Sequence, residues 1–305
     1  MSGRVLGIDL GGTKTAVAVV RDGTVLARDQ VDTPQSGFTD VVQAIARASL
    51  QLLQSAGPVR AAGLGSPGPL DFETGTIRWA PNIVGLENAP IVRALEAELG
   101  LPVTLENDAN AAGFAEHRYG AARGLPSSVF VTISTGIGGG LFLGDQVIRG
   151  AHGLAGEIGH MTLLPGGPVG GDGHLGTLES IAAGRSMERD AGYGFGSPVG
   201  NRVLFERARE GDPMALRIID NAAEFTGIGL ANIVKIFDPA AFVLGGGLTN
   251  AGDFYLDRIR QSFARHMTNY PLTMIRLAQL GADAGVIGAA AVAEVALLRT
   301  EGEPA

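Results

Sequence analysis

The two halves of the chain repeat one pattern of apolar strands and glycine turns, and this repeat restricts the fold more than any other feature. In the first half the strand VLGID runs into the glycine turn LGGTK, and the apolar run TAVAVV follows. In the second half the strand SVFVTIS runs into the turn TGIGGG and then into LFLG. A structural unit that recurs in one chain indicates two similar lobes. We therefore predict an α/β fold with duplicated βββαβα units, arranged as two lobes around a cleft.

The periodicity of apolar residues predicts the elements along the chain. In the first half we expect strands over 5–9, 15–20, 24–31, 61–64 and 101–105, and helices over 38–55, 91–99 and 109–119. In the second half we expect strands over 128–134, 141–144, 146–150, 240–247 and 272–278, and helices over 214–237, 253–267 and 284–298. We place a small lobe at 1–112 and a large lobe at 113–285. The final helix, within 286–305, is expected to pack back on the small lobe.

An insertion, residues 151–201, interrupts the large lobe. It holds three of the five histidines, His152, His160 and His174, and the glycine-dense run PGGPVGGDGHLGTLES. A run this rich in glycine does not pack by itself, so we predict a loop. Long loops inside a folded domain are typical of functional sites.

Charge and composition narrow the class of protein. The 305 residues carry 23 basic and 31 acidic side chains, a net charge of −8, which argues against a nucleic-acid surface. The absence of cysteine excludes disulfides and thiolate metal sites. No signal-peptide pattern begins the chain, and the apolar stretch AGVIGAAAVAEVALL is interrupted by Glu294. We expect a cytoplasmic protein with no membrane partner.

Polar residues follow the short apolar strand LPVTL in the stretch LENDAN. Asn107 and Asp108 stand between this strand and the helix expected over 109–119. One interpretation is that either residue caps the helix, since both types satisfy free N–H groups there. The other is that a carboxylate at a strand end faces a cleft, where open α/β sheets place their ligands.

The two glycine turns, DLGGTK and STGIGGG, each follow an expected strand. Glycines there let backbone N–H groups point at phosphate oxygens, although ordinary hairpin turns use glycine as well. Neither turn is a Walker A loop, and neither is a Rossmann fingerprint, because a strand follows each one. The candidate nucleotide-binding residues, including those of the third glycine run LGGGL, are Asp9, Gly11, Gly12, Thr13, Lys14, Thr135, Gly136, Gly138 and Gly246. Among these, Asp9 is the candidate to hold a hydrated Mg²⁺ ion.

Phosphoryl transfer needs phosphates that are held and neutralised, and a base near the acceptor hydroxyl. Asp108 is the candidate base. Near it we place Asn107 and three residues of the insertion, Glu157, His160 and Glu179, because such a set suits the vicinal hydroxyls of a sugar and repels an anionic substrate. The alternatives are that Glu179 is an acid favoured by a helix dipole and that His160 is structural.

The motifs DLGGTK, GSPGPLD, LENDAN, STGIGGG, GEIGH and TLE resemble those of the ROK family (repressors, open reading frames and sugar kinases), and most closely its bacterial glucokinases. They occur in the family's order over nearly the whole chain. The resemblance implies a two-lobed, actin-like (ribonuclease-H-like) ATPase fold that uses ATP and Mg²⁺. It further implies a hexose acceptor and a homodimer or homotetramer. The residues that it assigns to the sugar site are Gly68, Asn82, Asn107, Asp108, Glu157, His160 and Glu179, with Asp108 as the general base.

Two departures from the family pattern matter. ROK repressors carry a helix-turn-helix domain before the first phosphate turn, which here begins nine residues from the start, so we expect no repressor. The family also binds zinc through a histidine and three cysteines, whose positions correspond here to Gly170, Asp172 and Thr177. We therefore expect no zinc, and Asp172 is a candidate hydrogen-bond partner for His160 in its place.

The expected activity is ATP-dependent phosphorylation of glucose at its 6-hydroxyl. Two alternatives stay open. One is a kinase for another hexose, such as fructose, mannose or N-acetylmannosamine. The other is a non-catalytic sugar-binding regulator with the same fold, against which the intact base and phosphate turns argue. A Rossmann dehydrogenase is a distant third, because strands follow the glycine turns.

Overall fold

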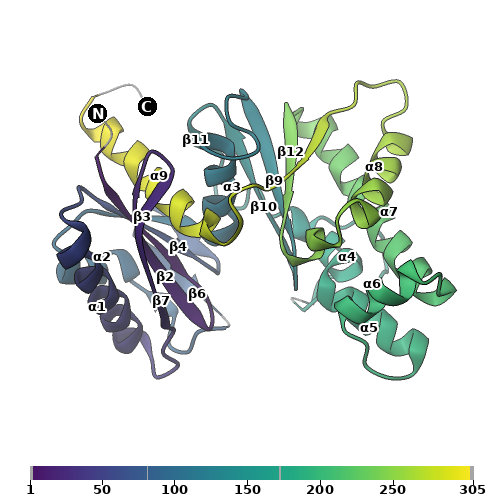
Figure 1. Cartoon of the computed structure of the whole chain (residues 1–305), viewed down its shortest axis with the longest axis horizontal. Coiled ribbons are helices and arrows are strands. Elements are labelled where there is room, and N and C mark those ends of the chain that lie inside the picture. The colour runs from purple at the N-terminus through teal and green to yellow at the C-terminus, as the bar shows by residue number, and fades with distance from the viewer. Residues whose placement is uncertain (1–2, 81, 172, 303–305) are drawn as a thin grey trace. The chain divides into compact units, whose positions relative to one another are not determined.

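The computed structural model describes residues 3–80, 82–171 and 173–302. These residues form two compact units (Figure 1). The first unit comprises 1–125, 140–155 and 279–305, and the second comprises 126–139 and 156–278. The lobe boundaries predicted after residues 112 and 285 stay a prediction.

A five-stranded sheet with the order β3-β2-β1-β4-β8 organises the first unit. β1 pairs antiparallel with β2 and parallel with β4, and β8 pairs parallel with β4. The strands are β1 (Val5–Leu10), β2 (Lys14–Arg21), β3 (Thr24–Asp32), β4 (Ala62–Ser66) and β8 (Val103–Asn107). The five strands predicted for the first half of the chain are therefore confirmed within a few residues. The structure adds a small antiparallel sheet that the sequence did not indicate, made of β5 (Leu70–Asp71), β6 (Thr76–Trp79) and β7 (Glu87–Ala89).

Helices cover both faces of the larger sheet of the first unit (Figure 1). One face, with the side chains of Leu6, Ile8 and Leu64, packs against α1 (Phe38–Ala56) and α2 (Ile91–Leu99). The other face packs against α9 (Ala284–Thr300), which lies beside α3 (Asp108–Arg118). The segment 281–300 is long and apolar enough to cross a membrane, but 61% of its apolar 18-residue window is buried here. It is therefore the core helix of this unit.

The second unit contains three parallel strands, in which β12 pairs with both β9 and β13. In the full sheet the order is β11-β10-β9-β12-β13. The strands are β9 (Ser127–Ile133), β10 (Ile137–Leu143), β11 (Gln146–Val147), β12 (Ala241–Gly245) and β13 (Met274–Leu277). The helices are α4 (Leu178–Ala182), α5 (Gly184–Phe195), α6 (Asn201–Arg209), α7 (Pro213–Phe237) and α8 (Asp253–His266). Short 3-10 helices are η1 (Ile158–His160) and η2 (Gly247–Ala251), and η3 (Gly281–Asp283) lies in the first unit.

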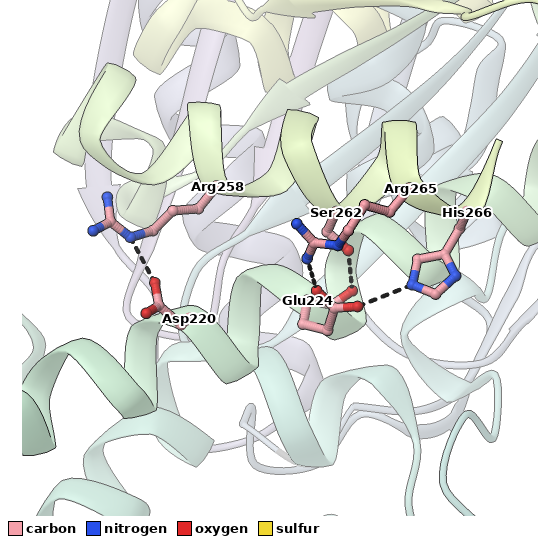
Figure 2. Close-up of polar contacts among 6 residues, drawn as sticks. All are labelled: Asp220, Glu224, Arg258, Ser262, Arg265 and His266. Carbon is pink, nitrogen blue, oxygen red and sulfur yellow. Dashed lines mark hydrogen bonds and ion pairs between the residues drawn. The ribbon is translucent and has the colours of Figure 1, made fainter. Parts of the chain in front are cut away.

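Polar side chains join the long helix α7 to α8 (Figure 2). Asp220 accepts a hydrogen bond from Nε of Arg258 at 2.7 Å. One turn further along α7, Glu224 pairs with Arg265 and lies 2.9 Å from Nε2 of His266. These contacts link α7 and α8, which pack against each other, at partly exposed positions.

The glycine-rich run that was predicted as a loop, 165–180, forms no helix or strand over its described residues 165–171 and 173–177, but its last three residues begin α4. The prediction was therefore wrong for 178–180, and α5 follows within the insertion. α5 contains three glycines and so has a low intrinsic helix propensity. Its residues Met187 and Ala191 are buried, and the helix packs against α4, α6 and α7, so tertiary packing stabilises it.

Candidate functional site

Three parallel strands of the first unit end at one edge of the sheet, and the predicted base lies there. Asp9 of β1 is in register with Gly65 of β4, and Gly65 is in register with Glu106 of β8. The next two residues, Asn107 and Asp108, form the transition from β8 into α3. Ligands of open α/β sheets bind outside the carboxyl ends of the strands. This edge is therefore the candidate site of the first unit.

The capping interpretation is confirmed for Asn107. Its Oδ1 accepts hydrogen bonds from the backbone N–H groups of Ala109 at 3.0 Å and Asn110 at 3.1 Å. Asp108 is the first residue of the helix, and its Oδ1 accepts from Ala109 at 2.8 Å. The helix start thus holds the Asp108 carboxylate in a defined orientation at the strand edge.

Two carboxylates with raised pKa values meet at this edge. Burial raises the pKa of Asp108 above its ordinary value, and the hydrogen bond from Ala109 opposes the rise. Burial, with a smaller contribution from the charge of Asp108, raises the pKa of Asp9 to about 6, and Arg28 opposes this rise. Perturbed carboxylates gathered at one edge are typical of functional sites.

The first glycine turn, residues 11–14, is held by its backbone carbonyls. Thr33 donates from Oγ1 to the carbonyl of Gly11 at 2.8 Å, and Gln35 donates from Nε2 to that of Gly12 at 2.8 Å. The side chains of the last two residues of the turn, Thr13 and Lys14, are exposed. No local sequence signal points to Thr33 and Gln35 as supports of the turn, because they lie 22 and 23 positions after the glycines that they bind.

The remaining predicted residues of the first unit, Gly68 and Asn82, lie near this turn and the small sheet. Asn82 is exposed and packs against the turn, since a β-carbon on Gly12 would be 3.0 Å from Cβ of Asn82. Gly68 has φ 111°, and a β-carbon there would be 2.1 Å from the carbonyl oxygen of Trp79. Only glycine fits such a position.

In the second unit the glycine turn follows β9. Gly136 lies in the turn, whereas Gly138 already belongs to β10. The observed turn is therefore shorter than the predicted one. The backbone N–H of Arg185, at the start of α5, donates to the carbonyl of Thr135 at 3.1 Å. Gly246, just after β12, is close to the end of β9, because a β-carbon on it would be 2.5 Å from the carbonyl oxygen of Ile133.

Glu179, Glu157 and His160 are brought to the same turn. Glu179 lies in the first turn of α4, where a helix dipole favours an acidic residue. Its Oε2 also accepts a hydrogen bond from the backbone N–H of Ile137 at 2.8 Å. A β-carbon on Gly159 would be 2.0 Å from the carbonyl oxygen of Ile137, so the GEIGH loop packs on the turn. Nε2 of His160 is 3.7 Å from Oε2 of Glu157, and both side chains are more than one third exposed.

Two of the three residues that stand at the family's zinc-binding cysteine positions, Gly170 and Thr177, supply no zinc ligand. Thr177 caps α4, since its Oγ1 accepts from the backbone N–H of Ser180 at 3.1 Å, and Gly170 has no side chain to offer. Asp172, the expected partner of His160, lies outside the described residues. Structural zinc sites need four N, S or O ligands, usually with cysteine among them, and this chain has no cysteine. Across the part of the chain that the structure describes, no group of three His, Cys, Asp or Glu could hold a metal ion.

Comparisons with known proteins agree over nearly the whole chain. The profile described as ROK family matches residues 5–296. A glucokinase of Streptomyces coelicolor is 36% identical over 312 aligned residues, which cover 95% of this chain and 98% of the relative. The crystal structure of a ROK hexokinase from Thermus thermophilus is 49% identical and covers 97% and 99% of the two chains, with a TM-score of 0.93. That of a ROK family glucokinase from Streptomyces griseus, in complex with glucose and AMPPNP, is 37% identical and covers 96% and 100%, with a TM-score of 0.80.

Proposed function

Because this chain belongs to the ROK family, we propose that it is an ATP-dependent hexose kinase that phosphorylates glucose at the 6-hydroxyl. It has the two-domain actin-like ATPase fold of ROK sugar kinases. The observation that carries the proposal is the edge where β1, β4 and β8 end. There Asp108 combines a partly buried carboxylate, a raised pKa and an orientation held by the start of α3.

Asp108 acts as the general base in this proposal. The 6-hydroxyl oxygen forms a bond to the γ-phosphorus of ATP, the bond from that phosphorus to the leaving oxygen of ADP breaks, and the hydroxyl proton passes to Asp108. A base with a raised pKa accepts this proton more readily than an ordinary aspartate does. Protonation of Asp108 before catalysis removes the acceptor, so activity falls on the acid side.

The nucleotide belongs at the glycine turns. In the first unit the carbonyls of Gly11 and Gly12 accept hydrogen bonds from Thr33 and Gln35, and these bonds hold the turn. The side chains of Thr13 and Lys14 are exposed, and we assign them to the phosphate oxygens. Oxygen ligands suit Mg²⁺, and Asp9 is the protein carboxylate that we assign to it. When bound, Mg²⁺ neutralises charge on the phosphates.

The family resemblance assigns to the sugar Asp108, Asn107, Gly68 and Asn82 of the first unit. In the second unit it assigns Glu157, His160 and Glu179. These residues offer neutral or negative groups, and they favour an uncharged hexose over a sugar phosphate. The similarity to a glucokinase with bound glucose favours glucose. We also infer a cytoplasmic homodimer or homotetramer, as is usual in the family.

The test is a coupled assay of ADP release with Mg-ATP and glucose, mannose, fructose or N-acetylmannosamine. We expect glucose to be preferred and Asp108→Asn to lower kcat by about 10²- to 10⁴-fold while glucose still binds by calorimetry. An Asp108→Asn enzyme with near-normal turnover would contradict the assigned base. Glucose binding without any turnover by the wild type would instead favour the non-catalytic regulator.

A further inference from the structure

Glu106 is a fully buried carboxylate directly before the capping residue and the proposed base. Its side chain has no exposed surface, and both of its oxygens are bonded. Oε1 accepts from the backbone N–H of Asn107 and from Nδ2 of Asn110, both at 3.0 Å. The orientation of this one carboxylate therefore determines where the backbone of the capping residue and the first turn of α3 lie.

Arg149 supplies the cation that faces Glu106. Its Nε donates to Oε2 at 2.8 Å, and Nη2 lies 2.5 Å from the same oxygen. The guanidinium also stacks on the ring of Phe72, with 5.1 Å between its central carbon and the ring centroid. The side chain of Glu106 is fully buried and that of Arg149 is 32% exposed, so solvent reaches the pair only from the arginine side. A planar guanidinium held on two sides restricts rotation more than a lysine would.

The segment that carries Arg149, residues 140–155, is attached to the opposite end of α3 by a second set of contacts. Nε2 of His117 lies 2.8 Å from the carbonyl oxygen of Gly144, and Nη1 of Arg118 donates to Asp145 at 2.8 Å. These contacts hold the β10–β11 turn but do not touch Glu106. One arginine thus takes part in the contacts at each end of α3, Arg149 of the segment at the start and Arg118 of the helix itself at the end, and only Arg149 contacts Glu106.

We propose that Arg149 is a positioning residue for Asp108 and that it acts through the carboxylate of Glu106. The proposal rests on the assignment of Asp108 as the base. Arg149 orients Glu106, Glu106 binds the backbone of Asn107 and the side chain of Asn110, and this turn of the chain places the Asp108 carboxylate. Arg149 is not itself in contact with the reacting groups.

The test compares Arg149→Ala with the matched control Arg118→Ala, which removes the arginine from the other end of α3. We expect Arg149→Ala to lower kcat by about 10- to 100-fold, as a small displacement of a base does, with the KM for glucose changed by less than about 3-fold. Arg149→Lys should fall between the wild type and Arg149→Ala. Arg118→Ala should reduce the melting temperature but leave kcat within about 3-fold of the wild type.

Two further measurements separate positioning from general loss of structure. Added guanidinium, below the concentrations that unfold the protein, should partly restore kcat in Arg149→Ala by occupying the space beside Glu106, and should not raise kcat in Arg118→Ala. The double variant Glu106→Gln/Arg149→Ala should be no slower than the slower of the two single variants. The reason is that both substitutions break the same contact, between Arg149 and Glu106. Independent, multiplying losses would overturn the proposal, and so would a normal kcat in Arg149→Ala. If the wild type turns over no sugar, it is the proposed function that fails.

Discussion

Replacing Asp9 by asparagine should stabilise the folded protein at neutral pH. The Asp9 carboxylate lies under the start of α9, where a β-carbon on Gly285 would be 2.3 Å from Oδ2 of Asp9. This packing removes water from the carboxylate, and the charge of Asp108 adds repulsion. Arg28 compensates only in part, so the pKa of Asp9 is about 6 rather than 3.8. An amide has nearly the same shape without the charge.

The sign and magnitude follow from the pKa shift. A raised pKa means that the folded state binds this proton more tightly than the unfolded chain does. The stability contributed by Asp9 is therefore fully present below about pH 3.8 and is lost as the pH rises to about 6. This shift corresponds to about 3 kcal/mol of unfolding free energy, at about 1.4 kcal/mol per pKa unit. Asp9→Asn should recover about this amount at about pH 7.5 and about half of it at about pH 5.

Urea unfolding without nucleotide and with divalent ions chelated measures this difference at both pH values. Asp32→Asn is the control, because Asp32 is an exposed aspartate at the end of β3 in the same sheet, and it should change little. An Asp9→Asn variant no more stable than the wild type at neutral pH would refute the reasoning, as would a gain independent of pH. The same variant should lose kinase activity if Asp9 holds Mg²⁺, since stability is often traded for function at such positions.

Three further sets of measurements test the close packing of glycines, the contact between Glu224 and His266, and the expectation that no zinc is bound. Gly288→Ala should destabilise the fold by about 1–3 kcal/mol, because a β-carbon there would be 1.7 Å from the carbonyl oxygen of Ala111. Gly192→Ala, where the nearest atom is 4.0 Å away, should instead stabilise by up to about 1 kcal/mol, and denaturant unfolding measures both. A hydrogen bond from His266 lowers the pKa of Glu224. The ionised Glu224 therefore stabilises the folded state above pH 4.5, its ordinary pKa, and this stabilisation is lost as the pH falls. Glu224→Gln should therefore reduce the free energy of unfolding by up to about 1 kcal/mol at about pH 7, seen as a slightly lower melting temperature. At about pH 3 it should have no such effect. Elemental analysis should find no stoichiometric zinc; a bound zinc ion would contradict our interpretation of the glycine-rich loop.

Local signals in the sequence predicted much of the secondary structure. The long helix predicted over 214–237 begins at a local signal, since the Asp212 side chain accepts from two backbone N–H groups and Pro213 is the first helical residue. Asn107 was a candidate cap and is one. Such signals lie within three or four residues of the group that they satisfy, so they can be read without knowing the fold.

The sequence by itself determined the repeat, the order of the main elements and the position of Asp108 between a strand and a helix. Only the tertiary structure decided the environment of that residue. Arg149 is distant in sequence from Glu106, and no local pattern pairs them. The raised pKa values of Asp9 and Asp108 likewise depend on burial and on the proximity of two strand ends. Desolvation and charge interaction act through space, across segments that the fold brings together, and this is why a linear pattern does not contain them.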